Sequence, residues 1–178
     1  WFIANNAVSG TTNYEYVLFT AAAQSTNWTF WDGASAPTST TFKNGWDGNR
    51  EMINYCFHSV DGFSKIGSYV GTGASGNSIV TGFRPAFVMI KEITTSNNSW
   101  CIFDNKRSSS NPIDDILFPN LSSAESVNNA NVFLNFNAAG FTIGNGFQIT
   151  NESGKSYIFI AFAEEVFVPD NFFNDDST

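Results

Sequence analysis

Few side chains in this sequence are suited to nucleophilic catalysis. His58 is the single histidine, so a Ser-His-Asp or Cys-His mechanism would have to use that residue, and no nucleophile elbow is present. The two cysteines, Cys56 and Cys101, lie in apolar stretches and form no Cys-x-x-Cys redox pair or zinc knuckle. The sequence therefore predicts a locally hydrogen-bonded His58 at the end of a strand and two buried thiols.

Paired carboxylates are the next candidates, because glycoside hydrolases use two of them about 5 to 10 Å apart. Glu164 and Glu165 are adjacent, as are Asp114 and Asp115, and neighbouring residues of a strand point to opposite faces. Hydrolysis would need carboxylates from different strands that converge, which is the alternative left open. The sequence predicts a protein that is not an enzyme.

The segment that begins at Asp104 has two interpretations. Asp104 with Asp114 and Asp115 could supply the oxygen ligands of a calcium site. Lys106 and Arg107 lie in the same loop, however, and would repel a cation. An ion pair between Asp104 and Arg107 that closes the loop is the simpler interpretation, so we expect no metal site.

A glycine-rich segment at residues 71–76, GTGASG, matches the Gly-x-Gly-x-x-Gly pattern of dinucleotide-binding loops. That pattern holds a pyrophosphate where a helix N-terminus follows it. Here the next residues, NSIVTGF, are typical of a strand. We therefore expect a flexible hairpin loop and no cofactor.

Aromatic residues beside Asp and Asn suggest carbohydrate binding, because sugar C–H faces stack on aromatic rings and polar side chains bind the hydroxyls. Trp31 with Asp32, and Trp46 with Asp47, fit that description and are the candidate ligand-binding residues. The alternative is that these tryptophans pack in the core or between copies of a repeat.

The hydrophobic pattern is that of an all-β protein. Short clusters rich in Phe, Ile, Val, Tyr and Trp are separated by Gly, Asn, Ser and Thr, and no stretch keeps a 3.6-residue period. One helical turn is expected at 122–127. The expected strands are 14–19, 28–31, 51–57, 65–70, 78–83, 86–93, 99–104, 115–118, 131–136, 140–144, 147–150 and 157–164. Trp100 and Ile102 should share one face of their strand, with Cys101 and Phe103 on the other, and both faces are apolar.

Composition limits the partners. The chain has 178 residues and a net charge of −8, so a basic surface for nucleic acid is excluded. No apolar run reaches the roughly 20 residues of a membrane helix, so no membrane insertion is expected. Because the first residue is Trp1, we expect a fragment or a matured piece of a longer protein.

An internal repeat is also visible. Residues 14–19 match 85–90, and residues 28–32 match 100–104, at nearly the same offset. Residues 52–57 resemble 157–162. The sequence therefore predicts an abbreviated first copy or added strands at 1–57 and a β-sandwich domain at 58–178, which could also form one compact unit. Chance similarity between aromatic-rich strands is the alternative.

Longer landmarks add a family resemblance. In order they are YCFHSVDGFSKIGSYVGTG, TGFRPAFVMIK, WCIFDNKR, NP at 111–112, LFPNLSSAES and GKSYIFIAFAE, spread from about residue 50 to 167. They resemble a repeat family of virion proteins of marine tailed phages, found in tail fibres and head fibres. The resemblance implies an antiparallel β-sandwich of the jelly-roll, concanavalin A-like type and a location in the virion.

From these features we expect a non-enzymatic virion structural protein, in a fibre or as a surface decoration, that is assembled in the host cytoplasm. Loops at 71–77 and 104–113 would contact the host or neighbouring subunits. The expected partners are other virion proteins and further copies of the chain in a homo-oligomer. The alternative is a lectin-like module that binds a host surface glycan through Trp31, Trp46 and Asp47.

Overall fold

The computed structural model describes residues 2–4, 15–18, 23, 25–26, 55–95 and 97–164. Three short strands form an antiparallel sheet in the N-terminal part of the chain: β1 (Phe2–Ala4), β2 (Glu15–Leu18) and β3 (Ser25–Thr26), in the order β1-β2-β3. The position of β2 confirms the strand predicted at 14–19. The strand predicted at 28–31 lies outside the described residues.

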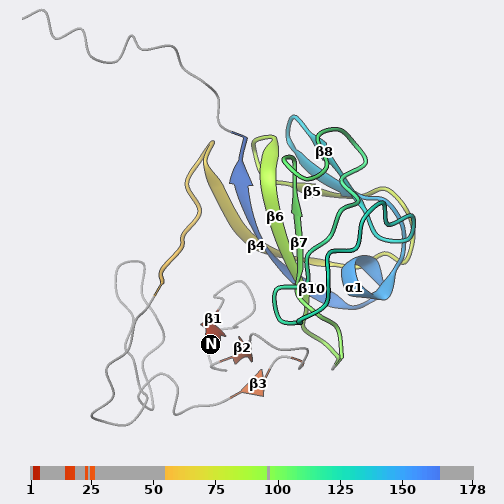
Figure 1. Ribbon diagram of the computed structural model, residues 1–178. Coiled ribbons are helices and arrows are strands. Elements are labelled where there is room, and N and C mark those ends of the chain that lie inside the picture. The colour runs from red at the N-terminus through yellow and green to blue at the C-terminus, as the bar shows by residue number, and fades with distance from the viewer. Residues whose placement is uncertain are drawn as a thin grey trace, which may run out of the picture.

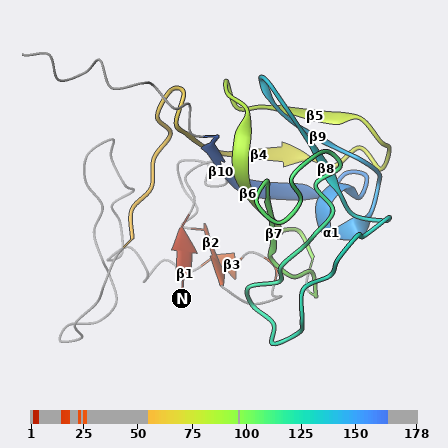
Figure 2. The same ribbon diagram turned by 45° about the horizontal axis from the view of Figure 1, so that its top comes forward.

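Two further antiparallel sheets form a β-sandwich (Figure 1). The first has the order β4-β10-β6-β7, with β4 at Ser64–Val70, β10 at Ser156–Ala163, β6 at Pro85–Glu92 and β7 at Cys101–Asp104. The second has the order β5-β9-β8, with β5 at Asn77–Val80, β9 at Gly140–Ile143 and β8 at Leu134–Asn137. Figure 2 shows the second sheet lying across the first. The all-β prediction and the sandwich are confirmed.

The core lies between these two sheets. Alternate residues of β6, β7 and β10 point inward, including Val88, Phe103 and Phe159, and meet Phe136 and Phe141 of the other sheet. The rings of Phe141 and Phe159 pack edge to face at a centroid distance of 5.5 Å. This period-two alternation is the pattern that β-branched and aromatic residues produce in a strand with a buried face.

Strand β7 is covered on both sides at its start, as the sequence predicts. Cys101 and Phe103 belong to the core between the sheets. Trp100, just before the strand, is 1% exposed and packs on the other face with Ile93 and Ile158.

Three element predictions are wrong, and a fourth is wrong in its described part. Residues 147–150 form no strand, because a short helix, α1 (Gln148–Asn151), buries Thr150 and Asn151. Residues 115–118 form only isolated bridges, which join Ile116 to Ser126 and Leu117 to Ile102. Residues 122–127 form no helical turn, and Ser126 takes part in the bridge to Ile116. Residues 55–57, the described end of the strand predicted at 51–57, form no strand either.

The glycine-rich loop at 71–76 differs from the expected flexible hairpin. It connects β4 of one sheet to β5 of the other. The Asn151 side chain holds it, since Oδ1 accepts from the Thr72 amide at 2.9 Å and Nδ2 donates to the Ala74 carbonyl at 2.7 Å. A Cβ on Gly71 would collide with the Glu152 carbonyl oxygen, so only glycine fits there. The strand that follows is β5, as the sequence predicts.

Candidate functional site

The most elaborate polar structure in the described residues is the loop after β7. Asp104, the last residue of β7, turns the chain through its Oδ1 atom, which accepts from the amides of Lys106 at 3.0 Å and Arg107 at 2.9 Å. This local capping by an Asp side chain is the ordinary way in which a carboxylate starts a loop. It fixes the direction in which the loop leaves the sheet.

Arg107 then connects three parts of the chain. Its Nε donates to Asp104 Oδ2 at 2.6 Å, its Nη1 to Glu125 Oε1 at 2.6 Å, and its Nη2 to the Ile102 carbonyl at 3.0 Å. The Asp104–Arg107 ion pair therefore exists where the sequence places it. Glu125 is a third member that sequence reasoning missed, because 18 residues separate it from Arg107.

Electrostatics favour the ionised network. Partial burial opposes ionisation of Asp104, but hydrogen bonds from the Arg107 amide and guanidinium and from the Lys106 amide outweigh it and lower the pKa of Asp104. Burial also opposes the charge on Arg107, yet its hydrogen bonds to Glu125 and Asp104 raise the pKa of its guanidinium. The three charges stabilise one another and fix the base of the loop.

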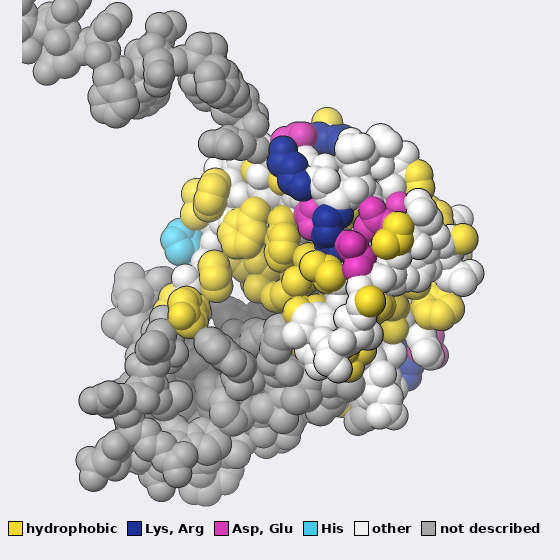
Figure 3. Space-filling view, in the orientation of Figure 1, with side chains coloured by type: hydrophobic (Ala, Val, Ile, Leu, Met, Phe, Trp, Pro, Cys, Tyr) yellow, Lys and Arg dark blue, Asp and Glu magenta, His cyan; other side chains and the backbone are white. Residues whose placement is uncertain are grey.

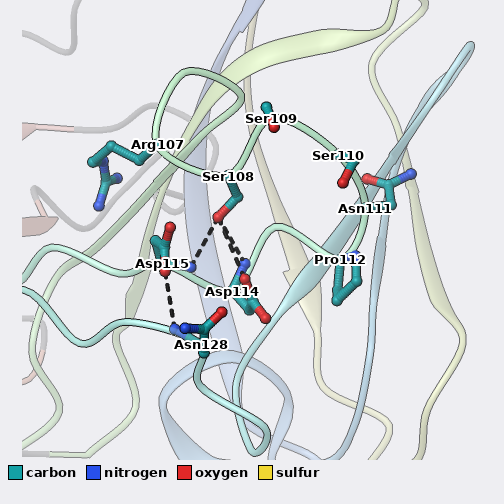
Figure 4. Close-up of a pocket in the computed structure, with 9 residues that line it drawn as sticks. All are labelled: Arg107, Ser108, Ser109, Ser110, Asn111, Pro112, Asp114, Asp115 and Asn128. Atoms are coloured by element: carbon teal, nitrogen blue, oxygen red, sulfur yellow. Dashed lines mark hydrogen bonds between the residues drawn. The ribbon is translucent and has the colours of Figure 1, made fainter.

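The middle of the loop is anchored by Ser108. This side chain is 7% exposed, and its Oγ accepts from the amides of Asp114 at 3.2 Å and Asp115 at 3.0 Å. Asp115 Oδ1 in turn accepts from the Asn128 amide at 2.9 Å (Figure 4). The Ser108 hydroxyl thus joins the two sides of the loop, and the Asp115 carboxylate joins the loop to the segment at Asn128.

Asn111 attaches the loop to the second sheet. Its Nδ2 donates to the Phe136 carbonyl and its Oδ1 accepts from the Phe136 amide, both at 2.8 Å. The side-chain amide therefore pairs with a residue of β8 much as a neighbouring strand would. A cis peptide bond joins Asn111 to Pro112.

These contacts surround an open recess of about 340 Å³. Its wall is almost wholly polar, with two carboxylates, two side-chain amides, three hydroxyls and one guanidinium (Figure 4). The residues are Arg107, Ser108, Ser109, Ser110, Asn111, Pro112, Asp114, Asp115 and Asn128. Such a wall can exchange hydrogen bonds with a hydroxylated or amide-bearing ligand.

The calcium alternative gains no support from this geometry. Asp104 uses its carboxylate on Arg107, and Asp115 uses Oδ1 on a backbone amide. Among the described residues no group of three or more His, Cys, Asp or Glu side chains is arranged to hold a metal ion.

The sugar-binding candidates cannot be placed in this geometry. Trp31, Asp32, Trp46 and Asp47 lie outside the described residues. No aromatic side chain lines the recess itself, whose lining residues are all described.

The other reactive residues lie elsewhere. His58 is exposed, and its Nδ1 lies 3.0 Å from the Ser59 carbonyl oxygen, which is the local hydrogen bond that the sequence predicts. His58 does not end a strand, however, because residues 55–59 form none. The prediction of two buried thiols is half wrong: Cys101 is buried, but Cys56 is exposed because residues 55–59 precede the first sandwich strand rather than forming part of it. Burial raises the pKa of the Cys101 thiol to about 12.

A second polar cluster, between β6 and β7, was not predicted. Lys91 and Glu92 are fully buried and Asn98 is 6% exposed. Lys91 Nζ donates to the carbonyls of Glu92 at 2.7 Å and Asn98 at 2.8 Å. Burial opposes the charge on Glu92, but hydrogen bonds from Thr95, Asn98 and Thr94 outweigh it and lower its pKa. Burial also lowers the pKa of Lys91. The cluster closes the β6–β7 connection, and Lys91 and Glu92 are fully buried, so we assign it a structural role.

Comparison with known proteins now places the chain in a family. The model of DUF7483, a domain of unknown function, matches residues 1–166. The chain belongs to this family. The matched DUF7483 span includes the N-terminal sheet, both sheets of the sandwich, the Arg107 network and the recess. No curated protein matches the chain, and no solved structure does. No helix in the described residues is long and apolar enough to cross a membrane.

Proposed function

We propose that this chain is a non-enzymatic structural module of a tailed-phage virion, in a fibre or as a surface decoration. The landmarks between residues 50 and 167 that resemble marine phage repeats support the location. The same resemblance implies that the sandwich is a concanavalin A-like jelly roll. The function of the module is to hold polar loops in fixed positions for contact with the host or with neighbouring subunits.

The observation that carries this proposal is the way the loop after β7 is anchored. Ser108 and Ile113 are buried, whereas Ser109, Ser110, Asn111 and Pro112 between them are exposed. The exposed tip is therefore presented by buried ends that the Arg107 network and the Asn111–Phe136 pair hold in place. A tip ordered before binding loses little conformational entropy when a partner arrives, which favours binding.

Charge favours protein partners over nucleic acid. The net charge is −8, which repels phosphate backbones and keeps the module soluble during assembly. The partners we propose are other virion proteins and further copies of this chain in a symmetric oligomer, assembled in the host cytoplasm.

Immunogold electron microscopy of purified phage particles tests the location. Particles are collected from cells that carry the gene and labelled with antibodies against the folded chain. Gold on fibres or on the particle surface is the expected result, and antibody preabsorbed with the chain is the control. Unlabelled particles, with the protein left in the cell lysate, would contradict the proposal.

A lectin-like module is the second candidate function, and the polar recess favours it. Asp114, Asp115, Ser109 and Ser110 offer acceptors and donors for sugar hydroxyls within a volume of about 340 Å³. The proposed aromatic and acidic contacts with the sugar remain Trp31, Trp46 and Asp47, and the sequence supports them.

A glycan array separates the two sugar-binding surfaces. Loss of binding in Asp114→Asn, with binding kept in Trp46→Ala, assigns the ligand to the recess, and the reverse assigns it to the tryptophan segment. Asp61→Asn, at an exposed turn outside the recess, is the matched control. Binding by neither the wild type nor a variant would remove this candidate. Sustained release of reducing sugar from a bound glycan would contradict the non-enzymatic assignment.

A further inference from the structure

The face of the β4-β10-β6-β7 sheet that points away from the β5-β9-β8 sheet carries mostly apolar side chains; we call it the outer face. Register places Phe162 beside Phe87, and Ile160 between Ile66 and Met89. Ile102 of β7 lies next to Met89 and completes the second row. Figure 3 shows hydrophobic side chains gathered over this sheet, bordered by charged groups.

Two exposed rings extend the outer face at one end. Phe57 and Phe63 each pack edge to face on Phe162 at a centroid distance of 6.0 Å. Phe57 and Phe63 are 60% and 61% exposed, so most of each ring faces outward from the apolar surface around Phe162. Large aromatic side chains rarely stay so exposed in groups unless something packs on them.

The size of the outer face favours one kind of occupant. Four strands about 4.8 Å apart and four to five residues at about 3.3 Å each, the part that Trp100 does not cover, give roughly 300 Å². A stable complex between two chains buries about 800 Å² on each partner, so this face alone is small for a dimer. It is large enough to hold a few strands of the same chain, for which association costs no translational entropy.

Chain connectivity also favours an occupant from the same chain. Among the described residues the sandwich part of the chain begins at Tyr55, and Phe57 contacts Phe162 of the outer face. Residues 1–54 are therefore tethered at this face, at an effective concentration on the order of millimolar, far above micromolar free copies. The family model covers residues 1–166, so the N-terminal part belongs to the same family unit as the sandwich.

We propose that residues 1–54 pack against the outer face and form a third layer on the sandwich. The composition of this segment suits an apolar surface. Its aromatic residues are Trp1, Phe2, Tyr14, Tyr16, Phe19, Trp28, Phe30, Trp31, Phe42 and Trp46. Its charged residues are fewer, namely Glu15, Asp32, Lys43, Asp47, Arg50 and Glu51.

Hydrogen exchange on the full chain tests the energetics of this contact. Phe63→Asp removes an exposed ring of the outer face, and Phe147→Asp removes a 43% exposed ring just before α1 as the matched control. We expect Phe63→Asp to speed exchange in peptides from residues 1–54 about tenfold, the loss expected for one aromatic contact. Phe147→Asp should leave these peptides unchanged. Equal exchange in both variants and the wild type overturns the proposal.

Photo-crosslinking tests the location without relying on a destabilising variant. Benzoylphenylalanine at position 63 should join a peptide from residues 1–54 within the monomer band, and the same group at position 147 should not. A crosslink between two chains, with a dimer mass in light scattering that depends on concentration, would assign the outer face to a second copy and overturn the proposal. Crosslinks only to the sandwich itself would also overturn it.

Discussion

Replacement of Arg107 by Met should destabilise the protein far more than replacement of its neighbour Lys106. Arg107 loses three hydrogen bonds, two of them to the carboxylates of Asp104 and Glu125. The side chains of Arg107, Asp104 and Glu125 are 20%, 21% and 33% exposed, so the pairs lie between the buried and the fully exposed limits. At about 0.7 kcal/mol for each bond, the variant loses about 2 kcal/mol.

Lys106→Met is the matched control, because it removes the same charge from the same loop. The Lys106 side chain is exposed, and the hydrogen bond that fixes this residue comes from its backbone amide. Its loss should therefore change the free energy of unfolding by less than about 0.5 kcal/mol.

Urea unfolding followed by circular dichroism measures both variants. We expect a loss of about 2 kcal/mol for Arg107→Met, which corresponds to a fall of about 4 to 8 °C in Tm for a chain of this size. Arg107→Lys should fall between the wild type and Met, since a point charge cannot replace the planar donor set. Equal stability of Arg107→Met and Lys106→Met would refute the assignment of Arg107 as the anchor of the loop.

Three other variants or conditions have defined outcomes. The pKa values of Asp104 and Glu92 are lowered in the folded state, so their stabilisation is complete above the unfolded pKa of about 4 and is lost as the pH falls through the lower folded values. The stability difference between wild type and Glu92→Gln should therefore shrink below about pH 4 in acid titrations, and a constant difference from pH 2 to 7 would contradict the account. Because Cys101 is buried with a pKa of about 12 and Cys56 is exposed, a thiol reagent at neutral pH should modify one cysteine in the native protein and both in denaturant; rapid modification of Cys101 in the native state would be the contrary result. Asn111→Ala should cost about 1 to 2 kcal/mol in chemical unfolding, because it removes both hydrogen bonds to Phe136, whereas Asn131→Ala, at an exposed position, should be nearly neutral.

The sandwich strands could be predicted because each leaves a local signature. Residues 65–70, 86–93 and 157–164 alternate inward and outward side chains, and the observed strands β4, β6 and β10 differ from these ranges by one residue at either end. Short apolar runs do not show this alternation, so their secondary structure is harder to predict. Residues 147–150 resemble a strand in composition, but tertiary contacts made by Thr150 and Asn151 select a helical turn.

Long-range contacts explain what the sequence could not show of the site. Asp104 and Arg107 are three residues apart, so their ion pair follows from local spacing. Glu125 and Phe136 reach Arg107 and Asn111 only because the sandwich brings distant loops together. The burial of Lys91 does not follow from local spacing either, because Lys91 lies beside Ile158 of β10 in the sheet. The roles of Trp31 and Trp46 stay predictions, because both lie outside the described residues.

Quantitative mass spectrometry of purified phage particles tests the central claim most directly. Particles from cells that carry the gene are separated from free protein on a density gradient, and peptides of this chain are counted against those of the major capsid protein. The account predicts that the chain copurifies with intact particles at a fixed ratio that high salt does not change. Peptides found only in the soluble cell fraction would contradict a role in the virion.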